Sequence, residues 1–350
     1  MNESDSASDI LVSLGKEIIQ AIRENKYPLL EIPDRRTSNI VYDEGLNHYI
    51  LGPSRNLRDS SNVKHVKRFA QLTWAASFAK KLLEASRTSS LRDLYYSSEA
   101  FGVGFTDQSE SDRIVTDLEC LTGLPRESFG IYPEEHSSIY GEVVMRYTVS
   151  GYEGKEIDLT VSPDGLPIGS ALMTAEPIRS SAEIVLAVES GGMFSRLIET
   201  KAWKRFNAIL VQLGGQPPRS TRRLMRNLHV SLGLPVYIFT DGDPWGMHIA
   251  KVITGGSANS AHIKNLTIPK AEWIGVTPDD ILQYSLPTDQ MTDADLKRLD
   301  ELSHDVRYST LQWQNYIQQF KNIRVKAEQQ AFSRFGMDFV VDTYLQQKIG

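Results

Sequence analysis

The sequence predicts a parallel α/β sheet preceded by a smaller α+β unit. Two short apolar runs, 184–188 and 236–239, each break abruptly into carboxylate and glycine residues, as buried parallel strands do. Helical stretches separate them, so we expect a Rossmann-like sheet with right-handed crossovers. Upstream, three helical patterns are followed by short alternating segments. At 350 residues the chain is long enough for both domains.

Residues 1–60 are expected to be an extension with an amphipathic helix over residues 5–26. Apolar residues recur there at helical spacing: Ile10, Leu11, Leu14, Ile18, Ile19 and Ile22. A helix so far from the next core pattern either docks on a partner or packs back on its own chain. The sequence leaves both interpretations open.

Residues 61–170 are expected to form the smaller domain. Its helices are predicted at 66–86, 90–102 and 111–121. Ser90 and Asp93 predict a capping box at the start of the second of these helices. Strand-like segments follow near 143–149 and 156–161. Three helices followed by short antiparallel strands predict a winged helix-turn-helix, a fold often used against duplex DNA.

Residues 171–350 are expected to form the parallel-sheet domain with a helical C-terminal part. Its strands are predicted at 184–188, 208–213 and 236–239. Beyond Asp293 the pattern is mostly helical, including 311–319 and 326–335.

Composition narrows the class of protein. No apolar run approaches the ~20 residues of a membrane helix, and the N-terminus does not resemble a secretory signal. The single cysteine, Cys120, excludes an internal disulfide and fits a reducing cytoplasm. The net charge of −6 hides an uneven distribution, because seven basic and no acidic residues lie from Lys201 to Arg226.

Three acids follow the predicted strands. Glu189 comes directly after one strand, and Asp241 and Asp243 follow another. Ligands of such sheets gather beyond the carboxyl ends of the strands, and carboxylate oxygens suit Mg²⁺. A lone Asp-Gly-Asp is more often a solvated turn than a ligand. The three acids on successive α/β units favour a shared metal site.

Two adjacent tyrosines are candidates for covalent chemistry. Tyr95 and Tyr96 lie on the second predicted helix, with Arg92 one turn before Tyr96. A phenol attacks phosphate poorly unless a cation stabilises its charge, which an arginine fork can do. The plainer interpretation is that both rings belong to the core.

The stretch of about 182–273, with its glutamate after one strand and its Asp-Gly-Asp after another, resembles the TOPRIM domain of topoisomerases, primases and nucleases. The segment Leu91-Arg92-Asp93-Leu94-Tyr95-Tyr96 resembles the signature of the A subunit of archaeal type IIB topoisomerases (topoisomerase VI) and of the related meiotic double-strand-break proteins. Further matching stretches are 215–222, 326–330 and 342–345. Segments 39–53 and 143–169 favour the archaeal form.

The resemblance implies an ATP-dependent topoisomerase subunit that makes 5′-phosphotyrosyl double-strand breaks. It implies that Tyr96 attacks DNA with help from Arg92, and that Glu189, Asp241 and Asp243 hold Mg²⁺. It also implies a homodimer in which the tyrosine of one protomer meets the metal site of the other. No ATP-binding loop is visible, so a separate ATPase B subunit is expected in a heterotetramer, contacted through 5–26.

Basic residues predict a DNA-binding face. Four arginines recur at helical spacing along one stripe, and three further cations lie on the smaller domain: Arg219, Arg222, Arg223 and Arg226, and Lys64, Lys67 and Arg68. Surface ion pairs are the ordinary alternative. A cytoplasmic, nucleoid-associated protein fits this picture. A TOPRIM-type nuclease or a meiotic-type break-forming protein without strand passage remains the alternative function, and a scaffolding protein with a relic site is a third.

Overall fold

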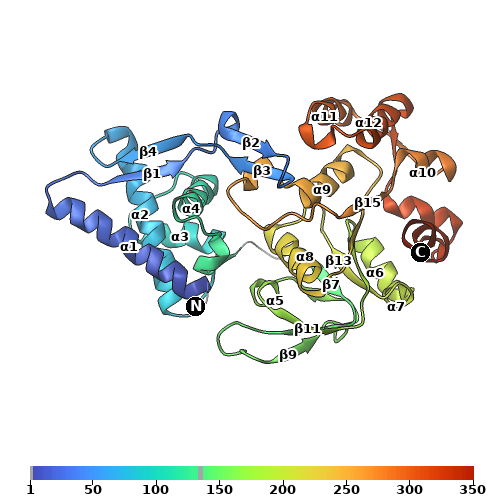
Figure 1. Ribbon diagram of the computed structural model, residues 1–350, viewed down its shortest axis with the longest axis horizontal. Helices are drawn as coiled ribbons and strands as arrows, with labels where there is room; N and C mark the ends of the chain where they lie inside the picture. Colours follow the sequence, from blue (N-terminus) through green and yellow to red (C-terminus); the bar gives the residue numbers. More distant parts are fainter. Residues whose placement is uncertain (1–2, 133–136) are drawn as a thin grey trace. The chain divides into compact units, whose positions relative to one another are not determined.

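The computed structural model describes residues 3–132 and 137–350, and the chain divides into two units that alternate along the sequence. The described part of the first unit comprises residues 3–43, 49–132 and 258–264. The second comprises 44–48, 137–257 and 265–350. Figure 1 shows the elements of each unit.

The first unit is mainly helical. Its helices are α1 (Glu3–Arg23), α2 (Val63–Glu84), α3 (Leu91–Ala100) and α4 (Gln108–Thr122), with 3₁₀ turns at Thr37–Asn39 and Arg126–Phe129. Strands β1 (Leu29–Pro33) and β4 (Arg55–Asp59) pair antiparallel, as do β2 (Ile40–Asp43) and β3 (His48–Leu51). Strands β5 (Ser89–Ser90) and β6 (Ile131–Tyr132) pair parallel. The three helices expected within 61–122 are therefore confirmed, to within three residues at most ends.

Local sequence signals set the ends of α3 and α4. The Ser90 hydroxyl accepts from the Asp93 N–H while the Asp93 carboxylate accepts from the Ser90 N–H, so the expected capping box is confirmed. Helix α4 ends at Gly123, which takes the left-handed conformation that glycine adopts without strain. Together the two caps fix where α3, which carries Tyr96, begins and where the next helix ends.

The N-terminal helix packs back on its own unit through only part of its apolar stripe. Ala7, Leu11 and Leu14 are buried in the same core as the apolar faces of α2 and α4. Toward the end of α1, by contrast, Ile19 is 50% and Ile22 59% exposed. The first half of α1 therefore packs back on its own chain, which is one of the two interpretations left open by the sequence. The second half keeps an exposed apolar face. Cys120, on α4, is buried in this core, as expected.

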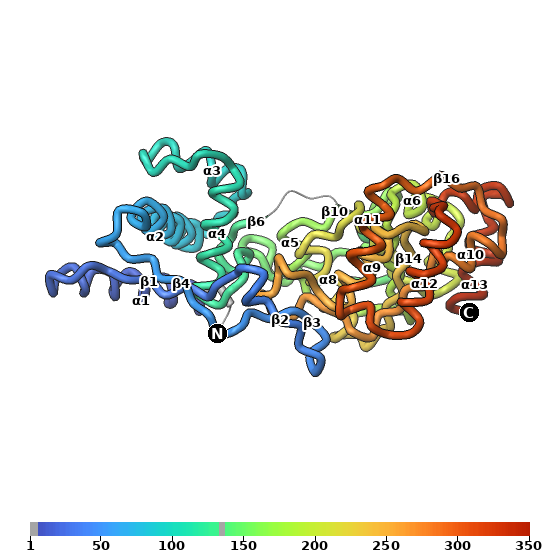
Figure 2. The backbone as a smooth tube through the Cα atoms, turned by 90° about the horizontal axis from the view of Figure 1, so that it is seen from above, coloured from blue at the N-terminus to red at the C-terminus, as the bar shows by residue number. Residues whose placement is uncertain are grey.

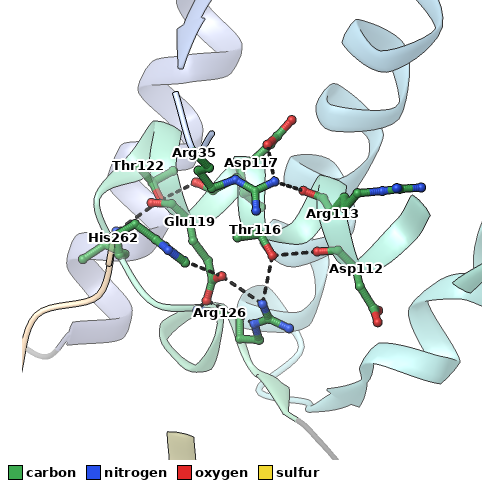
Figure 3. A network of polar contacts seen from close by, with 11 residues as sticks. Arg35, Asp112, Arg113, Thr116, Asp117, Glu119, Thr122, Arg126 and His262 are labelled. Carbon is green, nitrogen blue, oxygen red and sulfur yellow. Dashed lines mark hydrogen bonds and ion pairs between the residues drawn. The ribbon is translucent and has the colours of Figure 1, made fainter. Parts of the chain in front are cut away.

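A buried ionic network ties residue 262 into the first unit (Figure 3). The Glu119 carboxylate, fully buried on α4, accepts hydrogen bonds from the Arg126 guanidinium and lies 3.0 Å from His262 Nε2. Arg126 also donates to the Thr116 hydroxyl. His262 belongs to a short excursion, 258–264, that the chain makes into this unit between two stretches of the second. Nothing in the local sequence pattern signals this excursion.

We expect Glu119→Gln to destabilise the first unit by about 3–5 kcal/mol, because it leaves the Arg126 charge buried without its carboxylate partner. Urea denaturation measures the loss. The matched control is Glu84→Gln, which breaks the exposed pair with Lys80 on α2 and is expected to cost less than about 1 kcal/mol. Equal losses in the two variants would contradict a structural role for the buried network.

The second unit is built on a six-stranded sheet in the order β10-β7-β13-β12-β14-β15. Strands β12 (Ile184–Val188), β13 (Ala208–Gln212) and β14 (Val236–Phe239) are parallel, as the sequence predicted, and β15 (Glu272–Gly275), which it did not predict, pairs parallel with β14. Strands β7 (Ser138–Tyr140) and β10 (Leu166–Pro167) extend one edge antiparallel. The Toprim-like part of the expected fold is thereby confirmed at the level of its sheet.

Both faces of this sheet are covered, which explains why its strands are continuously apolar. Along β12, Leu186 and Val188 face one core, while Val185 and Ala187 face the other. Helices α6 (Gly191–Glu199) and α7 (Ala202–Arg205) contribute to the first core, and α5 (Ser170–Met173) and α8 (Arg219–Leu232) contribute to the second. Helix α9 (Pro244–Gly255) sends side chains to both.

The strands expected to complete the smaller domain lie in the second unit instead. Strands β8 (Val143–Arg146) and β9 (Glu156–Asp158) form a three-stranded antiparallel sheet with β11 (Glu176–Ser180). Strand β11 lies directly before the central strand β12 in the chain, and its pairing with β8 holds residues 143–158 in the second unit. The sequence pattern had placed these residues in the smaller domain, 61–170. Local alternation identified these strands but could not identify their partner.

The C-terminal part is helical with two exceptions to the expected pattern. Helices α10 (Pro278–Gln283), α11 (Asp293–Ser303), α12 (Leu311–Ile323) and α13 (Leu345–Ile349) follow β15 (Figure 2). A 3₁₀ turn at Val306–Tyr308 and a π-helical turn at Val340–Tyr344 lie between them, whereas the 3₁₀ turn at Ala258–Ser260 belongs to the first unit. The helix expected over 326–335 is wrong. That segment begins in β17 (Val325–Lys326), paired with β16 (Asp289–Gln290), and continues as a 3₁₀ helix over Gln329–Phe335.

Candidate functional site

Glu189 and Asp241 lie side by side at the carboxyl edge of the sheet. Strands β12 and β14 are parallel neighbours, with Val188 paired to Phe239, so the residues that follow them leave the sheet together. The Asp241 N–H donates to Glu189 Oε2 at 2.9 Å. The expectation that these two acids come to one edge of the sheet is therefore confirmed.

Asp243 caps the helix that follows. Its carboxylate accepts from the Gly246 N–H at 2.7 Å, and Pro244 occupies the first turn of α9, where its missing N–H leaves no hydrogen bond unmade. A side chain added at Gly246 would collide with the Asp241 carbonyl oxygen, so this close turn requires glycine. The Asp-Gly-Asp-Pro-Trp-Gly sequence thus encodes a turn that presents both aspartates at the strand end.

Burial and neighbouring negative charges raise the pKa values of all three carboxyl groups. Burial, and then the Asp241 charge, raises the pKa of Glu189 from 4.5 to about 8. Burial and the neighbouring Asp243 charge raise the pKa of Asp241 to about 6, although a hydrogen bond from the Gln329 N–H opposes the rise. Burial also raises the pKa of Asp243, against the Gly246 N–H and the Lys326 charge. The raised pKa values mean that the surroundings do not compensate the charges of these acids once they ionise, and hard carboxylate oxygens suit a divalent cation that would compensate them.

The three acids do not form a ready-made cage. Within residues 3–132 and 137–350, no three His, Cys, Asp or Glu side chains are grouped closely enough to hold one ion. This corrects the expectation that Glu189, Asp241 and Asp243 converge on one point. Each carboxylate instead accepts a backbone N–H, from Asp241, Gln329 and Gly246 respectively. A carboxylate has two oxygens, so these bonds leave Glu189 and Asp241 able to take a further ligand.

The C-terminal segment around Gln329 also belongs to this site, although the sequence pattern alone does not place it there. Ala327 bridges to Gly242 in both directions, and the Gln329 N–H donates to Asp241 Oδ1 at 2.8 Å. A helix was expected over these residues, and a helix would have paired their backbone groups internally. The resemblance noted at 326–330 is the sequence signal that could have marked them.

Tyr96 and Tyr95 have different environments on α3. The Tyr96 side chain is 55% exposed, whereas Tyr95 is half-buried and packs on the core of the first unit. Their rings meet edge to face with centroids 5.2 Å apart. Arg92, one turn before Tyr96, is exposed. The arrangement leaves one tyrosine ring exposed one helical turn from an exposed arginine, and the interpretation of both rings as core is wrong for Tyr96.

The predicted basic stripe on α8 is only partly accessible. Arg222 is 5% exposed, and Arg226 donates to the Thr267 carbonyl oxygen at 2.6 Å. Helical spacing placed them on one stripe, but that stripe faces protein, which corrects the assignment of Arg222 to a DNA-binding surface. Arg219 and Arg223 are half-buried.

The cations of the first unit are more accessible than the α8 stripe. Lys64, Lys67 and Arg68 are all exposed at the start of α2, and Lys67 pairs with Glu110. A partner's phosphates can reach these side chains without any rearrangement of the unit. They are therefore the better candidates for backbone contacts to nucleic acid.

A parallel sheet whose neighbouring strands end in a glutamate and an Asp-Gly-Asp turn defines a Toprim domain, a class of domain associated with divalent metals. The family model for the Toprim domain of the topoisomerase 6 A subunit and Spo11 matches residues 184–349, and the model described as "Type IIB DNA topoisomerase" matches residues 67–131. The second match lies within the first unit, and the first match covers most of the second unit.

Full-length similarity then identifies the family. The chain is 44% identical to the A subunit of type 2 DNA topoisomerase 6 from Methanothermobacter thermautotrophicus, over 100% of this chain and 98% of the relative. It is 37% identical to the proteins of the same name from Halobacterium salinarum (99% and 97% covered) and Archaeoglobus fulgidus (97% and 95%). The chain belongs to the family of type 2 DNA topoisomerase 6 A subunits, the DNA-cleaving subunits of type IIB DNA topoisomerases. Across the residues that the structure describes, no helix has the length and apolar character needed to span a bilayer.

Proposed function

We propose that this chain cleaves and religates duplex DNA with Tyr96 as the nucleophile. The observation that carries the proposal is the exposed Tyr96 ring on the capped helix α3, one turn from Arg92, while its neighbour Tyr95 is packed. The Tyr96 oxygen forms a bond to a backbone phosphorus as the bond to the 3′ oxygen breaks. The phenol loses its proton and the 3′ oxygen gains one, which gives a 5′-phosphotyrosyl end and a 3′ hydroxyl.

Arg92 would place its guanidinium beside the attacked phosphate and stabilise the phenolate as it forms. The transesterification exchanges one phosphoester for another, so the free 3′ hydroxyl can reverse it. Religation then needs no ATP. Two such cuts, one in each strand, produce a double-strand break that another duplex can cross.

The second unit would hold the divalent cation, for which we propose Mg²⁺. Glu189 and Asp241 supply the ligand oxygens, and Asp243, nearby at the start of α9, supports them. When bound, the cation stabilises negative charge that develops on the phosphate and the leaving oxygen. The Glu189 carboxylate also links the two strand ends, since it accepts the Asp241 N–H.

We further propose that the first unit acts as a winged-helix module and that the chain works as a homodimer, with the tyrosine of one protomer serving the metal site of the other. A separate ATPase B subunit would complete a heterotetramer. The exposed face of α1 at Ile19 and Ile22 supports docking through residues 5–26. A cytoplasmic, nucleoid-associated location follows from this role.

The decisive experiment mixes the chain with supercoiled DNA, Mg²⁺, ATP and the ATPase partner of a relative, then traps adducts with denaturant. We expect relaxation together with protein covalently linked to 5′ ends. Scission without an adduct would instead support a Toprim-type nuclease. Adducts without relaxation would support a break-forming protein that lacks strand passage.

DNA binding is expected to depend on cations at the start of α2. Replacing Lys64 and Arg68 by glutamate should weaken binding to all sequences equally and reduce the salt dependence by about one unit of slope for each lost phosphate contact. Titrations at several salt concentrations measure this slope. Lys26→Glu, at a lysine whose side chain is 71% exposed after α1, is the control. A slope as steep as that of the unaltered chain would remove this surface from the DNA path.

A further inference from the structure

Gln329 joins the two strand ends that carry the acids. Its side chain is fully buried, and its amide is engaged on both sides. Nε2 donates to the carbonyl oxygen of Phe239, the last residue of β14, at 2.9 Å. Oε1 accepts from the N–H of Ser190, the residue after Glu189, at 3.0 Å. One side chain therefore spans the exits of β12 and β14.

The backbone of the same residue reaches the acid itself. The Gln329 N–H donates to Asp241 Oδ1 at 2.8 Å, and two residues earlier Ala327 exchanges hydrogen bonds with Gly242 of 2.7 and 3.2 Å. The neighbouring Gln330 amide donates to the Ser190 hydroxyl. The segment 327–330 is thus hydrogen-bonded to both turns that carry the acids, the one after β12 and the one after β14. Among the oxygens of the proposed metal ligands, these contacts use only Asp241 Oδ1.

Such an arrangement fixes geometry rather than contributing charge. A glutamine amide is neutral, and its planar donor and acceptor allow a small range of positions for the two groups that it bridges. If the bridge were lost, the Ser190 N–H would lose its acceptor and the Phe239 carbonyl would keep only the Glu189 N–H, so one of the contacts that hold the two turns together would be gone. Groups of this kind around a metal site typically change affinity by about 10–100-fold when removed.

We propose that Gln329 is the positioning residue that sets the spacing between Glu189 and Asp241 and thereby the affinity of the site for its divalent cation. This inference rests on the proposed metal site. In this proposal the C-terminal 3₁₀ segment holds together the ends of two strands that lie about 90–140 positions earlier in the chain. Gln329 is not itself a ligand or a catalytic residue.

The test uses the full chain and Mg²⁺ alone, without DNA. Thermal unfolding is followed as Mg²⁺ is added, and the Mg²⁺ concentration that gives half of the maximal shift is recorded. We expect Gln329→Met, which keeps the volume and the backbone N–H but removes both side-chain bonds, to raise this concentration by about tenfold or more. Gln329→Asn, which keeps the amide on a shorter stem, should raise it less and serves if the methionine variant fails to fold.

The matched control is Gln314→Met. The Gln314 amide also donates to two backbone carbonyls in the second unit, those of Ser303 and Tyr308, and neither carbonyl belongs to the turns that carry the acids. It should lower stability without changing the half-saturating Mg²⁺ concentration. This comparison separates a general loss of packing from a loss of site geometry.

Glu189→Gln distinguishes the two ways in which the idea can fail. Suppose that Glu189→Gln loses its thermal response to Mg²⁺, while folded Gln329 variants keep the half-saturating Mg²⁺ concentration of the unaltered chain. The positioning role of Gln329 is then wrong, and the proposed metal site is retained. If Glu189→Gln responds to Mg²⁺ as the unaltered chain does, the metal site is wrong and the role of Gln329 falls with it.

Discussion

Tyr96→Phe is expected to abolish covalent protein–DNA adducts and to reduce cleavage by a factor of about 10⁴ or more, as loss of a nucleophile does. The substitution removes one hydroxyl from a ring that is 55% exposed, so the free energy of unfolding should change by less than about 0.5 kcal/mol. DNA affinity should stay close to that of the unaltered chain, because backbone contacts do not involve this hydroxyl. Denaturing gels with end-labelled DNA measure the adduct.

The neighbouring tyrosine provides the matched control. Tyr95→Phe alters the same helix and the same ring pair, but at the half-buried ring, and should leave adduct formation largely intact. Adducts that persist in Tyr96→Phe and vanish in Tyr95→Phe would move the nucleophile by one residue. Adducts that persist in both would end the covalent mechanism proposed for this helix.

Glu189→Gln is expected to change both the Mg²⁺ dependence of cleavage and the pH dependence of stability. In the chain without metal, burial and the Asp241 charge raise the pKa of Glu189 from 4.5 to about 8. Between these values the folded chain holds a proton that the unfolded chain has released. The free energy of unfolding should therefore fall as pH rises through this window, by up to about 1.4 kcal/mol for each pH unit from this group.

The glutamine variant lacks this titration. With metal removed, its free energy of unfolding should therefore exceed that of the unaltered chain by an amount that grows as the pH rises toward 8. Added Mg²⁺ should reverse the order at pH 8 by stabilising the unaltered chain alone. Urea denaturation from pH 5 to 8.5 measures both effects. Glu183→Gln, at an exposed glutamate just before the same strand, is the control. Parallel pH profiles for the unaltered chain and Glu189→Gln would show that this carboxylate is not the perturbed group.

Local patterns predicted the elements of the site well. The apolar runs at 184–188 and 236–239 became neighbouring parallel strands, because only strands covered on both faces need to be apolar throughout. Ser90 and Asp93 defined the start of α3, since a capping box is made by residues three apart and needs no distant partner. These signals sufficed to place Glu189 beside Asp241 and to locate Tyr96 on a helix.

Other predictions failed where the answer depended on distant contacts. The spacing of Arg222 and Arg226 gave their helical stripe correctly, but periodicity does not say whether protein or solvent covers that stripe. Segment 326–335 was expected to be a helix, yet its first residues pair with β16 and with Gly242. Strands β8 and β9 pair antiparallel as expected, but they lie in the second unit, because β8 also pairs with β11, which follows it only after an intervening stretch.

The amino-acid sequence by itself determined the candidate residues: two adjacent tyrosines on one helix with an arginine one turn before the second, and acids at the ends of two apolar strands. Their residue types and short-range spacing encode this directly, through helical periodicity, capping and strand burial. Only the tertiary structure decided how the acids are held, with Gln329 bridging Ser190 and Phe239, and how His262 joins Glu119 in the first unit. Such contacts join residues about 90–140 positions apart, and no local pattern records them because their free energy is gained only once the chain has folded.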